Sequence, residues 1–109
     1  MRFMLKLSIP TESGNQCVMD GSLGSTIESI LLDLKPEAAY FTDDHGVRTG
    51  FIFCNIKDEP EIPGIAEPWF LAFGADVELH AAMTVSDLKK AASGFEQAIK
   101  KYSRRPTPA

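Results

Sequence analysis

Cysteine and histidine are scarce, with two of each among the 109 residues. Cys17 and Cys54 do not have the spacing of metal ligands, and His45 and His80 fall on different predicted elements, so no metal site is expected. Both thiols are predicted to be free and buried. The sequence also lacks a glycine-rich phosphate loop and a nucleophile elbow, and no cofactor is predicted.

Long apolar runs are absent as well. No stretch approaches the length of a membrane span, and the first ten residues lack both the apolar core and the small-residue cleavage site of a signal peptide. Positive charge is not concentrated in one region of the sequence. The 11 Lys and Arg residues are interspersed with 15 Asp and Glu residues, apart from a small basic cluster in the tail. We therefore expect a cytoplasmic protein with no nucleic-acid or membrane partner.

What is present begins with a strand and a helix. Residues 2–8 alternate between apolar and polar side chains, which is the period of a half-buried strand. Apolar residues spaced three and four apart then predict a helix that ends near Leu34. This helix begins either at Thr11 or later, near Ser22, because glycines weaken its first half.

A β-hairpin is predicted next. Residues 38–42 and 47–56 are rich in aromatic and β-branched residues, and they flank the turn signal "DDHG". A three-residue loop over residues 44–46 would place Tyr40 opposite Gly50.

A second helix follows the hairpin. Asp58 is predicted to cap it, with Glu61 three residues further on as the capping-box partner. Pro68 is expected to kink this helix or to divide it into two short ones before it ends near Gly74.

The last elements are a strand over residues 75–82 and a third helix. Thr84 and Asp87 form a capping-box-like start, and an apolar stripe then extends to Tyr102. Residues 103–109 are polar and contain proline, and we predict a disordered tail there.

This order of elements predicts one α+β domain over residues 1–102. Right-handed crossovers joined by a hairpin give a ferredoxin-like βαββαβ fold, a four-stranded antiparallel sheet with its first and third strands central, plus a C-terminal helix. Two helices cover one face of such a sheet and leave the other face bare.

Strand periodicity assigns side chains to the two faces. The set predicted beneath the helices is Phe3, Leu5, Leu7, Ala39, Phe41, Phe51, Phe53, Val77, Leu79 and Ala81. The set predicted on the bare face is Met4, Lys6, Tyr40, Thr42, Arg48, Ile52, Cys54, Glu78, His80 and Ala82. Because the second set mixes apolar and titratable residues, we expect two sheets to pack face to face in a homodimer or higher homo-oligomer around a small cavity.

His80 and Glu78 are the candidate catalytic residues of that face. Imidazole titrates near neutrality, and a carboxylate beside it favours its charged form, so the pair could exchange protons with a ligand. The alternative is that both side chains make polar contacts across the dimer interface.

The candidate ligand-binding residues are Tyr40, Arg48, Lys6 and Trp69. Arg48 and Tyr40 could hold a carboxylate or an oxyanion, or they could form a cross-strand pair near the end of the hairpin. Lys6 is a weaker candidate, because such a lysine is more often a surface residue, and Trp69 could line an aromatic pocket or belong to the core or to a subunit interface.

Two other functions of the same fold do not match the residues. The stretch "RTGFIFCNI" is similar to the pattern of an RNA-recognition sheet, but the predicted register turns Phe51 and Phe53 inward. An acylphosphatase-like enzyme needs an arginine in the loop after the first strand, and "PTESGN" has none.

The element order, the bare face and the passage "EPWFLAFGADVELHAAM" resemble the dimeric α+β barrel superfamily, and most of all its muconolactone isomerase-like branch. The resemblance implies at least a homodimer with a ligand pocket beside the sheet. We therefore expect a protein that binds a small organic acid or aromatic ligand. The alternative is a cofactor-independent small enzyme, isomerase-like or monooxygenase-like, with His80 as general acid/base.

Overall fold

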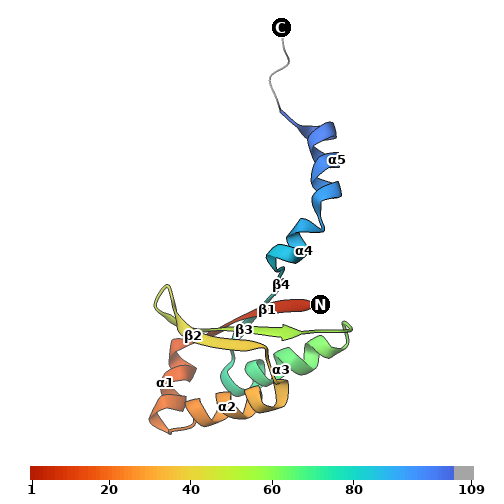
Figure 1. Cartoon of the computed structure of the whole chain (residues 1–109). Coiled ribbons are helices and arrows are strands. Elements are labelled where there is room, and N and C mark those ends of the chain that lie inside the picture. The colour runs from red at the N-terminus through yellow and green to blue at the C-terminus, as the bar shows by residue number, and fades with distance from the viewer. Residues whose placement is uncertain (105–109) are drawn as a thin grey trace.

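A computed structural model of the chain describes residues 1–104 (Figure 1). It has an α+β architecture with a four-stranded antiparallel sheet. In chain order the elements are β1 (Arg2–Ile9), α1 (Thr11–Met19), α2 (Leu23–Leu34), β2 (Ala38–Asp44), β3 (Val47–Asn55), α3 (Glu61–Phe73), β4 (Asp76–Ala81), α4 (Val85–Lys89) and α5 (Ala92–Tyr102).

The sheet is open and has the strand order β2-β3-β1-β4, so β1 and β3 are central. Helices α1, α2 and α3 all lie against the same face of the sheet (Figure 1). The core fills the space between them, and the other face, which we call the open face, is not covered by any described helix. This arrangement is compatible with a ferredoxin-like fold. The fully buried core residues include Leu5, Leu7, Ile52 and Trp69.

The first crossover contains two helices. Gly21 has a φ of +78°, in the left-handed region that favours glycine, and the backbone N–H of Ser22 donates to Oδ1 of Asp20 over 2.9 Å. This turn ends α1 and lets α2 begin after Ser22. The late start predicted near Ser22 is therefore correct for α2, and a separate helix precedes it.

Helix α3 is a single helix that begins at Glu61 rather than at a cap on Asp58. The Glu61 carboxylate accepts the backbone N–H groups of Lys57 at 2.7 Å and Asp58 at 3.0 Å, and these hydrogen bonds lower its pKa. Pro68 lies inside the helix and does not divide it. As a proline, it cannot donate a backbone hydrogen bond to the carbonyl of the residue four positions earlier, Gly64.

The hairpin has a two-residue loop, so the predicted register is wrong by one residue. Asp44 pairs with Val47, and the two loop residues, His45 and Gly46, have φ angles of +52° and +76°. Positive φ at both positions is the signature of a type I′ turn, whose twist matches that of the strands. As a result Tyr40 pairs with Phe51 rather than with Gly50.

A one-residue shift exchanges the two faces of a strand, and this corrects the predicted faces of β3. Ile52 pairs with Leu5 and is fully buried, and Arg48 pairs with Ile9 on the same helix-covered face. Cys54 is buried there too. The side chains that β3 presents on the open face are those of Phe51 and Phe53, which are half-buried.

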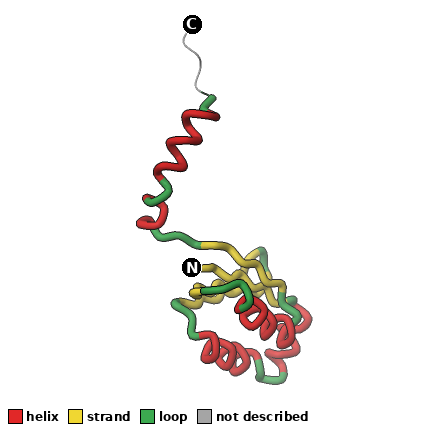
Figure 2. The backbone as a smooth tube through the Cα atoms, turned by 90° about the vertical axis from the view of Figure 1, so that its right-hand side faces the viewer, coloured by secondary structure: helices red, strands yellow, loops and turns green. Residues whose placement is uncertain are grey.

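The C-terminal segment forms an arm, residues 83–102, which holds two helices where the sequence predicts one. The predicted capping box is confirmed: Thr84 Oγ1 accepts from the Asp87 N–H at 3.1 Å, and Asp87 Oδ2 accepts from the Thr84 N–H at 3.0 Å. Helix α5 runs away from the sheet in both views (Figures 1 and 2), and the molecule measures 70 × 30 × 21 Å. From residue 105 onward the predicted disordered tail lies outside the described residues.

Across residues 1–104, no helix is both long and apolar enough to span a membrane.

Candidate functional site

The candidate site is the open face of the sheet, where strand pairing aligns side chains in two rows. In the first row, Met4 on β1 lies between Phe53 on β3 and His80 on β4. In the second row, Lys6 on β1 lies between Phe51 and Glu78, and Tyr40 extends the row on β2. Each row therefore runs from an apolar or aromatic end on β2 and β3 to a titratable end on β4.

His80 and Glu78 contact each other at the titratable end. His80 Nε2 lies 3.3 Å from Glu78 Oε1, and both side chains are about half exposed, at 52% and 55%. Residues two apart on a strand point to the same face, which makes this contact possible within one strand. The geometry allows proton exchange with a ligand placed over Met4, but no described charge besides Glu78 contacts the imidazole.

Lys6 is held by the end of the hairpin. Its Nζ lies 2.5 Å from Oδ2 of Asp44, and this hydrogen bond raises the pKa of Lys6 and lowers that of Asp44. The other oxygen of Asp44 lies 2.8 Å from Nδ1 of the exposed His45. The ammonium group is thus already neutralised and is not a free anchor for an acid.

The structure separates Arg48 from Tyr40 and corrects their predicted pairing. On the helix-covered face, Arg48 Nη2 donates to Asn15 Oδ1 at 3.1 Å, and its side chain crosses Gly14 on α1. The guanidinium borders a cavity of about 300 Å³ at the edge of the sheet. The apolar lining of that cavity is Ile9, Leu23, Ile27 and Phe41.

Trp69 does not reach the open face. It is fully buried, and its ring stacks on Phe73 with centroids 6.2 Å apart, so the core placement considered for it is the one observed. Its indole N–H has no hydrogen-bond partner among the described residues. Trp69 therefore packs the helix-covered side of the sheet.

The reason given above for excluding an RNA-recognition sheet is wrong, since Phe51 and Phe53 face outward on a central strand. In such sheets, aromatic side chains on the open face stack on bases. Two features still disfavour nucleic acid. Strand β1 contributes Met4 and Lys6 to this face but no aromatic residue. A phosphate backbone would meet the carboxylate of Glu78, while the described cations of β1, Lys6 and Arg2, are each paired with a carboxylate.

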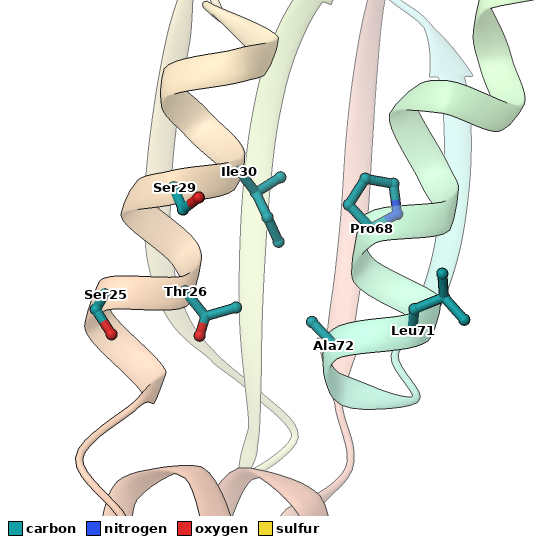
Figure 3. Close-up of a pocket in the computed structure, with 7 residues that line it drawn as sticks. All are labelled: Ser25, Thr26, Ser29, Ile30, Pro68, Leu71 and Ala72. Atoms are coloured by element: carbon teal, nitrogen blue, oxygen red, sulfur yellow. The ribbon is translucent and has the colours of Figure 1, made fainter.

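A shallow groove of about 470 Å³ lies on the opposite side of the molecule, between α2 and α3 (Figure 3). Its lining is Ser25, Thr26, Ser29, Ile30, Pro68, Leu71 and Ala72. None of these side chains titrates, so the groove offers shape and hydroxyl groups but no acid or base. Within residues 1–104, no group of three or more His, Cys, Asp or Glu side chains is placed to hold a metal ion.

Comparisons with known proteins do not identify a family. No family model and no curated protein matches the chain. Among solved structures, a formyltetrahydrofolate deformylase from Pseudomonas putida KT2440 aligns with a TM-score of 0.46 and 19% sequence identity, over 75% of this chain and 29% of that one. The chain therefore spans less than a third of that protein. The structure shows a small α+β protein with a four-stranded antiparallel sheet, which is compatible with the ferredoxin-like fold.

Proposed function

We propose that the protein binds a small polar aromatic ligand on the open face of the sheet, within a homodimer. The observation that carries the proposal is the composition of the two side-chain rows, in which Tyr40, Phe51 and Phe53 adjoin the contacting pair Glu78 and His80. Aromatic side chains stack on a ring, and an imidazole can share a proton with its hydroxyl group. A homodimer matches the resemblance to dimeric α+β barrels and would shelter this surface.

Charge favours a neutral aromatic ligand over an organic acid. The described positive groups on this side of β1, Lys6 and Arg2, are paired with Asp44 and Glu37, and Glu78 is half exposed. A carboxylate ligand would therefore meet carboxylates without a free cation, which is unfavourable at short range. A phenol or a lactone carries no such penalty and still offers an oxygen to His80.

A second function, a cofactor-independent enzyme of the muconolactone isomerase-like kind, is favoured by the 3.3 Å contact between His80 and Glu78. In that function His80 removes a proton from the bound ligand, and Glu78 stabilises the imidazolium that forms. Loss of a carbon-bound deuterium from a ligand, followed by NMR in ordinary water, distinguishes catalysis from binding alone.

A thermal-shift screen against phenols, lactones and small carboxylates tests the proposal, because a ligand that binds only the folded state raises the melting temperature. We expect phenols or lactones to raise it in the native protein, and His80→Ala and Phe51→Ala to reduce that rise. His45→Asn is the matched control, since His45 is 94% exposed at the hairpin turn and belongs to neither row. An unchanged rise in the His80→Ala and Phe51→Ala variants would place the ligand elsewhere and contradict the proposal.

A further inference from the structure

The arm carries an apolar face that no described residue of its own chain covers. Phe95, Ile99 and Tyr102 follow one another at spacings of four and three along α5, so they lie on one side of the helix. They are 53%, 54% and 71% exposed. The arm's other large exposed apolar residues are Met83, Val85 and Leu88. Among the described residues, none of α4 or α5 belongs to the core or packs against it.

The base of the arm is fixed to the sheet in a direction that carries α5 away from it. The backbone N–H of Ala82 donates to the carbonyl of Arg2 at 3.0 Å. The Arg2 guanidinium pairs with Glu37 at 2.8 Å and lies 3.9 Å from Asp87 at the start of α4. Both views show the arm extending clear of its own sheet (Figures 1 and 2). A helix with this much exposed apolar surface requires a partner.

The arm and the rest of the chain have opposite charge. Residues 1–82 contain five Lys or Arg and 13 Asp or Glu, a formal charge of −8, whereas the arm, residues 83–102, contains four Lys and two Asp or Glu, a formal charge of +2. Lys100 and Lys101 lie in the last turn of α5 and contribute to the positive charge of the arm. On the open face, the half-exposed carboxylate of Glu78 and the Asp44 that holds Lys6 adjoin the aromatic side chains. The basic, apolar arm is thus complementary to the acidic, aromatic open face.

The length of α5 also agrees with the width of the open face. An 11-residue helix such as α5 is about 16 Å long at about 1.5 Å per residue. Four strands spaced about 4.8 Å apart span about 14 Å from the first to the last. One such helix therefore crosses the whole open face, from β2 to β4.

We propose that the arm of each copy docks across the open face of a second copy, with Phe95, Ile99 and Tyr102 against Met4, Phe51 and Phe53. The contact is reciprocal, as two-fold symmetry requires, so each open face is covered once. This inference builds on the proposed function, because the docked arm covers the ligand site, and a bound aromatic ring would lie between the arm and the side chains of Phe51 and Phe53.

A partner sheet packed directly on the open face is the competing arrangement. It would bring two acidic bodies together and oppose Glu78 of one copy to the acids of the other, and it would leave the apolar faces of both arms exposed. Arm exchange covers both apolar surfaces and pairs unlike charges.

Disulfide cross-linking between chains that each carry one introduced cysteine tests the arrangement, in a Cys17→Ser background that leaves the buried Cys54 in place. We expect a tagged Ile99→Cys chain to form covalent dimers with an untagged Phe53→Cys chain. Tyr40→Cys, at a 67% exposed position of the same face, provides a second partner if Phe53→Cys does not fold. Leu32→Cys, 68% exposed on α2 among the helices, is the matched control and should not cross-link to Ile99→Cys.

Three results would overturn the proposal. Cross-linking of Phe53→Cys or Tyr40→Cys only to itself would indicate sheet-on-sheet packing. An intrachain bond in the Ile99→Cys/Phe53→Cys double variant at high dilution would show that the arm folds onto its own sheet. The third result comes from analytical ultracentrifugation of the native protein at concentrations above about 100 μM. A mass equal to that of a single chain would exclude the dimer itself.

Charge reversal gives an independent measurement. Lys100→Glu with Lys101→Glu should raise the dissociation constant of the dimer about tenfold at low salt, and the difference should shrink as salt screens the charges. Lys57→Glu, outside the arm, is the control and should leave the constant within about twofold of the native value. Equal dissociation constants for all three proteins would contradict the charge complementarity. Dimerisation is measured without ligand, so a dimer that binds no aromatic ligand contradicts the proposed function alone. A monomer that binds one contradicts this inference and the homodimer, but leaves the ligand-binding part of the proposed function in place.

Discussion

Phe41 on β2 lies directly opposite Gly50 on β3, and its ring occupies the space that a side chain at position 50 would need. A Cβ atom added to Gly50 would be 2.7 Å from Cε1 of Phe41 and 3.2 Å from Cγ of Leu7. The register that allows this close approach is the one that places Phe51 and Phe53 on the open face. The site therefore depends on a glycine in the middle of a central strand.

Gly50→Ala should lower the free energy of unfolding by about 1–3 kcal/mol, because the added methyl group overpacks a space between an aromatic ring and the buried Leu7. Urea titration followed by the fluorescence of the one tryptophan, the buried Trp69, measures the change. Gly64→Ala is the matched control: nothing lies within 4 Å of its added Cβ, and alanine is favoured in a helix by up to about 1 kcal/mol. If Phe41→Leu fails to recover part of the loss in Gly50→Ala, the clash is not the cause.

The same hairpin shows how far the sequence determines the site. Alternation within β1 and β4 is enough to place Lys6, Glu78 and His80 on one face, because both strands have a covered and an uncovered side. Alternation cannot decide the face of β3, whose residues are apolar in both phases from Phe51 to Cys54. The loop length decides it, and "DDHG" is compatible with two or three loop residues. The structure selects two, and Arg48 moves to the other face.

The helices also show which features are set by neighbouring residues and which are set by residues far apart in the sequence. The capping box of Thr84 and Asp87 is local, and the sequence predicts it correctly. The apolar residues keep a helical spacing across the junction between α4 and α5. Periodicity alone therefore does not reveal the break between the two helices. The direction of the arm depends on Arg2, which lies more than 80 residues from Asp87 in sequence, and contacts at such separation are not encoded in any local pattern.

Gly14→Ala tests the contact of Arg48 with α1. The added Cβ would be 2.6 Å from Nη1 of Arg48, but this atom is the end of a flexible side chain and can move. We expect the free energy of unfolding to change by less than about 1 kcal/mol, because alanine also stabilises the helix. NMR signals of the Arg48 guanidinium and the Asn15 amide should shift as their 3.1 Å hydrogen bond is lost. A loss as large as that of Gly50→Ala would show that Arg48 cannot move.

The two thiols should differ in reactivity. Cys54 is 3% exposed, and burial raises its pKa, so little thiolate is present or accessible near neutral pH. Cys17 is half-buried on α1 rather than buried as predicted, and it is the more accessible of the two. A colourimetric disulfide reagent should modify Cys17 first and Cys54 only as the protein opens. Removal of the fast phase by Cys17→Ser confirms the assignment, and a fast phase that survives this substitution refutes it.

The ion pair of Lys6 and Asp44 should contribute to stability over a defined pH range. The hydrogen bond from Lys6 lowers the pKa of Asp44, so the contribution is present above the ordinary aspartate pKa of about 3.9 and is lost as the pH falls through the lower folded value. The raised pKa of Lys6 has the opposite consequence: its contribution is present below the ordinary lysine pKa of about 10.4 and is lost as the pH rises through the higher folded value. Lys6→Met should therefore raise the pKa of the Asp44 carboxyl, measured by NMR, and make the fall of stability in acid less steep. Lys89→Met on the arm, far from the hairpin, should leave both measurements unchanged. An Asp44 carboxyl that titrates at the same pH with and without Lys6 would mean that the contact does not persist in solution, and the open face would then present a free ammonium group to its ligand.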